Sequence, residues 1–145
     1  MRIEFTIDDT ALFYAVMDKT ILDKKGLESV SGTTLGDMFA LSKDESDAFF
    51  AELDNVINAL SLRVPQMEWT PNEGINFAVE SSRNIAPHSI AMLVERALYY
   101  KMLFWWYEPR NANLAVVAND NANQTILAIK RLLESNTTTR PYRYF

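Results

Sequence analysis

The residues that could do chemistry are few, and their spacing completes no catalytic or metal-binding motif. The chain has one histidine, His88, and no cysteine. A catalytic histidine needs an orienting partner within hydrogen-bond reach, and a zinc site with a single histidine would depend on carboxylates, which is uncommon. His88 directly follows Pro87, a residue type favoured on the first turn of a helix. We therefore interpret His88 as a polar residue on that turn.

Two acidic groups could pair carboxylates for acid–base chemistry or hold a divalent cation. They are Asp8 with Asp9, and Asp44 with Glu45 and Asp47. Both groups stand where helices are predicted to start, and the helix dipole alone favours acids there. An enzyme would need carboxylates such as Asp44, Asp47 or Glu80 to converge in one cleft, and no sequence pattern predicts that convergence.

Motifs for phosphate, calcium and nucleophilic chemistry are missing as well. The segment 119–124 carries oxygen-bearing side chains but lacks the glycine and the closing glutamate of a calcium loop. The four glycines form no phosphate-binding loop, and no Gly-x-Ser-x-Gly elbow is present. We therefore predict a protein that is not an enzyme, with no cofactor, no metal ion and no catalytic residue.

The strongest candidate for a functional site is the segment 136–145. It begins with a polar, β-branched spacer and continues with two cations and three aromatic rings, the residue types enriched at interface anchors. Addition to the sheet edge of a neighbour would supply the hydrogen bonds that rings alone do not. Folding back onto its own domain is the alternative. The predicted partner-binding residues of this segment are Arg140, Tyr142, Arg143, Tyr144 and Phe145.

A dense aromatic cluster over residues 99–107 is the second candidate. Consecutive rings on a helix point in all directions, so they cannot all face one core. We predict that Trp105, Trp106 and Tyr107 contribute to a subunit contact. Two alternatives stay open for this cluster, namely packing in the core and a pocket for a small molecule.

The first half of the chain contains the pattern of a strand followed by two helices. Alternating apolar residues over 3–7 predict a short N-terminal strand. A helix follows from the capping residues at 8–10, and Gly26 is its predicted end. Ser42 and Glu45 have the spacing of a capping box, and the apolar stripe behind them predicts a second helix that ends before Pro65.

The second half contains a predicted hairpin and two further helices. Alternation over 67–70 and 75–79, around the turn-forming residues 71–74, predicts a β-hairpin. A third helix is predicted from Pro87 to about Tyr107, apolar nearly all round and therefore central in the fold. A fourth is predicted from about residue 112 to 134, with a candidate bend at 119–124 because that stretch forms helix poorly.

The composition and length predict one globular domain. The chain of 145 residues is 48% hydrophobic and 23% charged, which fits a single domain over 1–135 with an extension over 136–145. Residues 1–60 hold twelve acids against five bases, a net charge of −7, and residues 61–145 hold seven acids against nine bases, a net charge of +2. This asymmetry favours head-to-tail contacts between copies, whereas the net charge of −5 disfavours nucleic-acid binding.

No segment is predicted to enter a membrane. The nonpolar run 102–107 is far shorter than the roughly 20 residues that cross a bilayer, and the N-terminal residues carry no secretion signal. The chain is therefore predicted to act without a membrane and without binding nucleic acid in a sequence-specific way.

The second half of the chain resembles small virion proteins of tailed phages and prophages. The likeness consists of an aromatic helix over 96–107, a Glu-Pro break at 108–109, a helix ending at 129–133, and then Arg140-Pro141-Tyr142-Arg143. It covers about residues 90–145. Such proteins are typically noncatalytic, form rings at the neck or tail of the particle, and hold their neighbours with extended termini. The resemblance implies the same for this chain.

These patterns together predict a mainly helical α+β fold of about four helices, an N-terminal strand and a β-hairpin. The predicted function is that of a noncatalytic structural subunit, located in a virion or the bacterial cytoplasm. Its predicted partners are copies of itself and other structural proteins of the same assembly. The alternative is a small soluble bacterial module that binds a ligand or a protein through an aromatic pocket.

Overall fold

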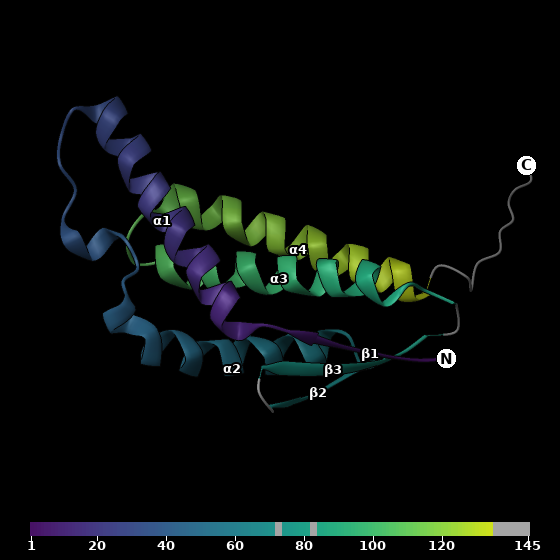
Figure 1. Cartoon of the computed structure of the whole chain (residues 1–145). Helices are drawn as coiled ribbons and strands as arrows, with labels where there is room; N and C mark the ends of the chain where they lie inside the picture. Colours follow the sequence, from purple (N-terminus) through teal and green to yellow (C-terminus); the bar gives the residue numbers. More distant parts are fainter. Residues whose placement is uncertain (72–73, 82–83, 135–145) are drawn as a thin grey trace, which may run out of the picture.

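Three short strands and four α-helices make up the part of the chain that the computed structural model describes, which is residues 1–71, 74–81 and 84–134 (Figure 1). This is a mainly helical α+β fold, as predicted. The strands are β1 (Arg2–Ile7), β2 (Met67–Pro71) and β3 (Ile75–Glu80). The helices are α1 (Asp9–Ser31), α2 (Ser46–Arg63), α3 (Pro87–Tyr107) and α4 (Ala112–Glu134). Two short 3-10 turns, η1 (Asp37–Phe39) and η2 (Lys43–Glu45), connect α1 to α2.

The sheet is antiparallel with the strand order β1-β3-β2, so β3 lies in its centre. The predicted hairpin of β2 and β3 is confirmed, and the N-terminal strand pairs with it, with Phe5 opposite Phe77. Alternation decides which face is buried, because successive side chains of a strand point to opposite faces. The buried face presents Ile3, Ile7, Ile75, Phe77, Val79 and Met67.

Helix α1 is longer than predicted, and the expected end at Gly26 is wrong. Asp8 caps its start by accepting a hydrogen bond from the Ala11 N–H at 3.0 Å. The helix passes through Gly26, where an added Cβ would meet nothing within 4 Å, and it ends at Gly32, whose φ of 74° is left-handed. An exposed glycine inside a helix costs only about 1 kcal/mol, whereas the left-handed position favours glycine strongly.

Helix α3 is the central helix, as its uniformly apolar sequence predicts. It contacts α1, α2, α4 and β1, and in Figure 1 it runs side by side with α4 while α1 crosses it. Ile90, Val94, Leu98 and Met102 are each 0% exposed, so this face forms the middle of the core. Pro87 occupies the first turn, where its missing N–H has no cost.

Helix α4 is continuous, and the candidate bend at 119–124 is absent. Small residues let this helix approach α3 closely, since Ala118 and Ala122 are buried. Two polar residues of the stretch 119–124 bond to other elements: Asn119 accepts a hydrogen bond from Lys101 of α3, and Asn123 accepts one from Arg63 of α2. These contacts offset the weak helix propensity of the segment.

Candidate functional site

The predicted partner-binding residues fall into two groups with different outcomes. Arg140, Tyr142, Arg143, Tyr144 and Phe145 lie outside the described residues, so their binding role stays a prediction. Trp105, Trp106 and Tyr107 are described, and all three pack inside this chain. Trp106 and Tyr107 are each only 2% exposed, and Trp105 is half-buried. Packing in the core, one of the two alternatives left open for this cluster, accounts for most of the surface of these three side chains.

The polar atoms of the two buried rings are bonded within the chain. The Trp106 Nε1–H donates to the Phe39 carbonyl at 2.7 Å, and the Tyr107 hydroxyl donates to Asp23 Oδ2 at 2.6 Å. Phe39 belongs to η1 and Asp23 to α1. The end of α3 therefore fastens two segments that are far away in the sequence.

Asp23 also forms an ion pair within α1. Its second oxygen accepts a hydrogen bond from Lys19 Nζ at 2.8 Å. Burial, and then the hydrogen bond to Asp23, raise the pKa of the Tyr107 hydroxyl far above its ordinary value. Tyr107 therefore stays protonated at neutral pH, which suits a hydrogen-bond donor and not a general base.

Arg110, in the turn between α3 and α4, contacts the C-terminal end of α3 and η1. Its guanidinium lies 3.5 Å from the centre of the Trp106 ring, a cation–π contact. It also donates to the Met38 carbonyl at 2.9 Å and to the Trp106 carbonyl at 2.8 Å. The aromatic end of α3 is thus a structural joint between η1, α1 and the α3–α4 turn.

The acidic groups and the histidine lie at the starts of helices. Asp8 caps α1, Asp44 is an exposed residue of η2, and Asp47 is in the first turn of α2. His88 is exposed on the first turn of α3. Within the described ranges, no three His, Cys, Asp or Glu side chains are grouped closely enough to hold a metal ion.

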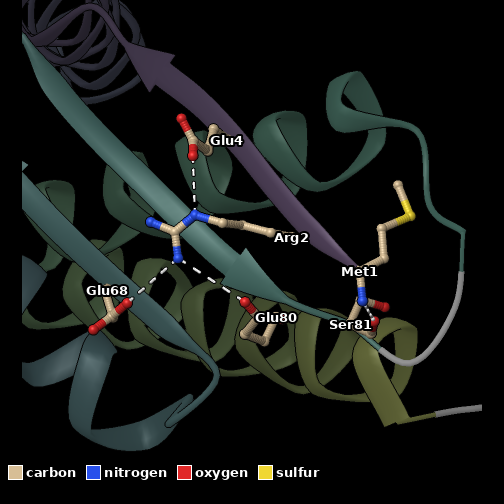
Figure 2. A network of polar contacts seen from close by, with 6 residues as sticks. All are labelled: Met1, Arg2, Glu4, Glu68, Glu80 and Ser81. Carbon is tan, nitrogen blue, oxygen red and sulfur yellow. Dashed lines mark hydrogen bonds and ion pairs between the residues drawn. The ribbon is translucent and has the colours of Figure 1, made fainter.

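The outer face of the sheet carries a cluster of three carboxylates around Arg2, which we call the acidic patch (Figure 2). Arg2 is surrounded by carboxylates from all three strands: its Nε is 2.9 Å from Glu4 Oε2, and its Nη1 is 3.9 Å from both Glu68 and Glu80. These side chains are exposed, so each ion pair contributes little to stability. Three carboxylates around one guanidinium leave this face with a net negative charge.

The edge of the sheet at β1 has unpaired backbone groups. Met1 and Ser81 exchange two backbone hydrogen bonds, at 2.8 and 2.9 Å. Antiparallel pairing alternates, so the odd residues Ile3, Phe5 and Ile7 bond to β3, and Arg2, Glu4 and Thr6 direct their N–H and C=O groups outward. These outward groups have no hydrogen-bond partner among the described residues. We refer to Arg2, Glu4 and Thr6 as the β1 edge.

Two hollows lie between the helices, and the sequence had indicated only a possible small-molecule pocket at the aromatic cluster over residues 99–107. An open groove of about 450 Å³ separates α1 from α3, and a smaller cavity of about 140 Å³ lies between α2, α3 and α4. The groove is lined by Ala11, Leu12, Ala15, Met92, Glu95, Arg96, Tyr99 and Tyr100. Burial raises the pKa of Tyr99 in this groove. For the smaller cavity, the one sequence feature that could have indicated a site is Lys101, a single charged residue within the apolar run of α3.

Comparisons with protein families, with curated proteins and with solved structures give no match to this chain. None of the described helices combines the length and the apolar character needed to span a bilayer.

Proposed function

We propose that this chain is a noncatalytic structural subunit that assembles with copies of itself and with other structural proteins of a phage-type particle. In this proposal the segment 136–145 of one subunit binds the β1 edge of its neighbour. The observation that carries the proposal is the match between an unpaired, acidic sheet edge and a basic, aromatic segment of the same chain.

Charge supports this pairing. The segment 136–145 contains two arginines and no acidic residue. The outer face at the β1 edge holds Glu4, Glu68 and Glu80 against the single Arg2. Complementary charge of this kind guides association and sets the orientation of partners.

Backbone chemistry supports it as well. Ordering a free segment costs about 1–2 kcal/mol per residue, so buried rings need backbone hydrogen bonds beside them. The three consecutive threonines at 137–139 are good strand formers, and the outward groups of Arg2, Glu4 and Thr6 present donors and acceptors over a strand of similar length. Strand addition of this kind takes its affinity from main-chain hydrogen bonds.

The opposite edge of the sheet is less suited to this role. The Met67 N–H on β2 already donates to the Val64 carbonyl at 3.0 Å. Pro71, the last residue of β2, has no N–H to offer. Strand β2 also contacts α2. The β1 edge is therefore the better acceptor for an added strand.

Light scattering on the full-length protein tests the assembly. We expect an oligomer whose population falls sharply in the double variant R140E/R143E, because the reversed charges face the acidic patch. The double variant K24E/K25E on α1 makes the same change in net charge away from the segment and should leave the oligomer intact. A wild-type chain that stays monomeric at high concentration, with neighbouring structural proteins added, counts against the assembly function.

A substitution at the β1 edge tests where the segment binds. Proline at position 4 removes the outward N–H while the bonds of Ile3 and Phe5 to β3 remain. Glu4→Pro should therefore dissociate the oligomer, whereas Glu4→Ala keeps the N–H and controls for the lost carboxylate. If the oligomer persists in both variants, the subunits contact each other through another surface than the β1 edge.

A ligand-binding module is the second candidate function. The groove between α1 and α3 favours it, since two tyrosines and a methionine line a hollow of about 450 Å³, a size found among small-molecule sites. A ligand that raises the melting temperature of a monomeric wild type, and that loses this effect in Tyr100→Ala, would support this function over assembly.

A further inference from the structure

The small cavity between α2, α3 and α4 has an apolar lining. Its volume of about 140 Å³ is close to the roughly 150 Å³ of an engineered apolar cavity that binds benzene. The apolar side chains around it are Val56, Ala59, Leu60, Ala97, Leu98 and Ile126. The cavity can therefore hold a group the size of a benzene ring.

Two cations line the same cavity, and helix α4 tethers both of them. Lys101 of α3 is half-buried and donates from Nζ to Asn119 Oδ1 at 3.1 Å. Arg63, the last residue of α2, is exposed and donates from Nη1 to Asn123 Oδ1 at 3.0 Å. Asn119 and Asn123 are one helical turn apart, so α4 holds the two positive charges next to each other through neutral amides.

These two charges have no acidic partner in the described part of the chain. Neither Arg63 nor Lys101 forms an ion pair with a described residue. Besides its bond to Asn119, Lys101 Nζ lies 5.8 Å from the centre of the Phe104 ring, a contact that supplies no negative charge. Burial and the neighbouring Arg63 lower the pKa of Lys101, because both disfavour its charged form. The chain has 19 acids for 14 bases, so a shortage of carboxylates is not the reason.

We propose that this cavity binds a small monocarboxylate that carries an apolar group of about the size of a benzene ring. The carboxylate binds to Lys101 and Arg63, which removes their mutual repulsion, and the apolar group enters the lining formed by Leu60 and Ala97. An apolar lining with a few placed polar groups is the usual build of a small-molecule site. This site is separate from the β1 edge and does not depend on assembly.

Calorimetry and thermal unfolding of the full-length protein test the site with benzoate as the probe. Benzyl alcohol has the ring without the charge, and acetate has the charge without the ring. We expect saturable binding of benzoate, at least about tenfold tighter than either control, since both halves of the site contribute. Equal affinity for benzoate and benzyl alcohol would overturn the proposal, and so would the lack of saturable benzoate binding at low ionic strength.

Variants identify the residues that bind the probe. Lys101→Met keeps the length of the side chain without its charge, and Arg63→Gln removes the charge of an exposed residue while keeping an amide that can donate a hydrogen bond. Each should weaken benzoate binding about tenfold or more, whereas Arg131→Gln on the exposed side of α4 should not. Wild-type affinity in Arg63→Gln would refute the site even if Lys101→Met failed to fold.

A cavity-filling variant provides an independent test. Ala59 lines the cavity from an exposed position on α2, so Ala59→Leu should occupy the space without disturbing the core. Its far-ultraviolet circular dichroism and its oligomeric state should match those of the wild type, while benzoate binding is lost. Benzoate binding that is unchanged in Ala59→Leu would contradict a site inside the cavity.

Discussion

Removal of one hydroxyl group, in Tyr107→Phe, should destabilise the fold by about 1.5–3 kcal/mol. Tyr107 is 2% exposed, and its hydroxyl donates to the Asp23 carboxylate at 2.6 Å. Hydrogen bonds to charged groups are among the stronger ones in proteins. Asp23 keeps its bond to Lys19 in the variant, so the cost should stay below that of a fully unpaired buried charge.

The dependence of this effect on pH gives a second measurement. Burial and the bond to Asp23 raise the pKa of Tyr107 above its ordinary value of 10.0. A raised folded-state pKa contributes stability that is complete below pH 10 and is lost as the pH rises toward the folded-state value. The gap between wild type and Tyr107→Phe should therefore be constant at neutral pH and shrink by about 1.4 kcal/mol per pH unit above pH 10.

Urea unfolding followed by circular dichroism at pH 7, 9, 10.5 and 11 measures both quantities. Tyr14→Phe is the matched control, because it removes the hydroxyl of a tyrosine that is 41% exposed, and its stability should stay within about 0.5 kcal/mol of wild type. Equal stability of Tyr107→Phe and wild type at pH 7 would refute the structural role of the bond. A gap that stays constant to pH 11 would refute the raised pKa.

Three further substitutions test the rest of the framework, each by urea unfolding. Gly32→Ala should lower the free energy of unfolding by about 1 kcal/mol, because its φ of 74° suits only glycine well. Gly26→Ala, inside the helix, should instead raise it by up to about 1 kcal/mol. If both variants changed the stability equally, α1 would not end at Gly32. Arg110→Ala should cost about 2 kcal/mol through the lost contacts to Trp106 and η1, and full stability in that variant would disprove the joint. Phe49→Ala should cost about 3–5 kcal/mol, since this ring is 0% exposed, and a cost under 1 kcal/mol would remove Phe49 from the core.

The order of the elements could be predicted because each leaves a local pattern in the sequence. Alternation marked β1, β2 and β3, and Pro87 with the apolar run behind it marked α3. The end of α1 could not be predicted in this way. Gly26 and Gly32 look alike in sequence, and only the three-dimensional structure shows that Gly26 faces open space while Gly32 has a left-handed φ.

The continuity of α4 was also not predictable from local sequence. The stretch 119–124 is a poor helix former by itself. Two of its asparagines meet cations on α2 and α3, and Ala122 is fully buried. These are tertiary contacts between residues 18 and 60 positions apart in the chain, and no local pattern announces them.

The aromatic cluster was predicted as a contact site, with packing in the core left open, and its surroundings explain why Trp106 and Tyr107 are buried. Residues 27–42 form no regular pattern in the sequence, yet they place Phe39 beside Trp106 and Tyr107. The cavity with Lys101 and Arg63 likewise depends on three helices meeting. Sites formed where elements distant in the sequence meet cannot be predicted from the spacing of residues along the chain.

The pairing of the first strand with β3 constrains the order in which the newly made chain can fold. Met1 and Ser81 are bonded across 80 positions of sequence, and ribosomes add about 5–20 residues per second, so β1 waits roughly 4–16 s for its partner. Helices α3 and α4 are joined by a short turn and can dock as soon as both have emerged. All three strands nevertheless emerge before α3 and α4, so the interval in which β1 has no companion comes early in synthesis, and it is the stage at which a chaperone has most to protect.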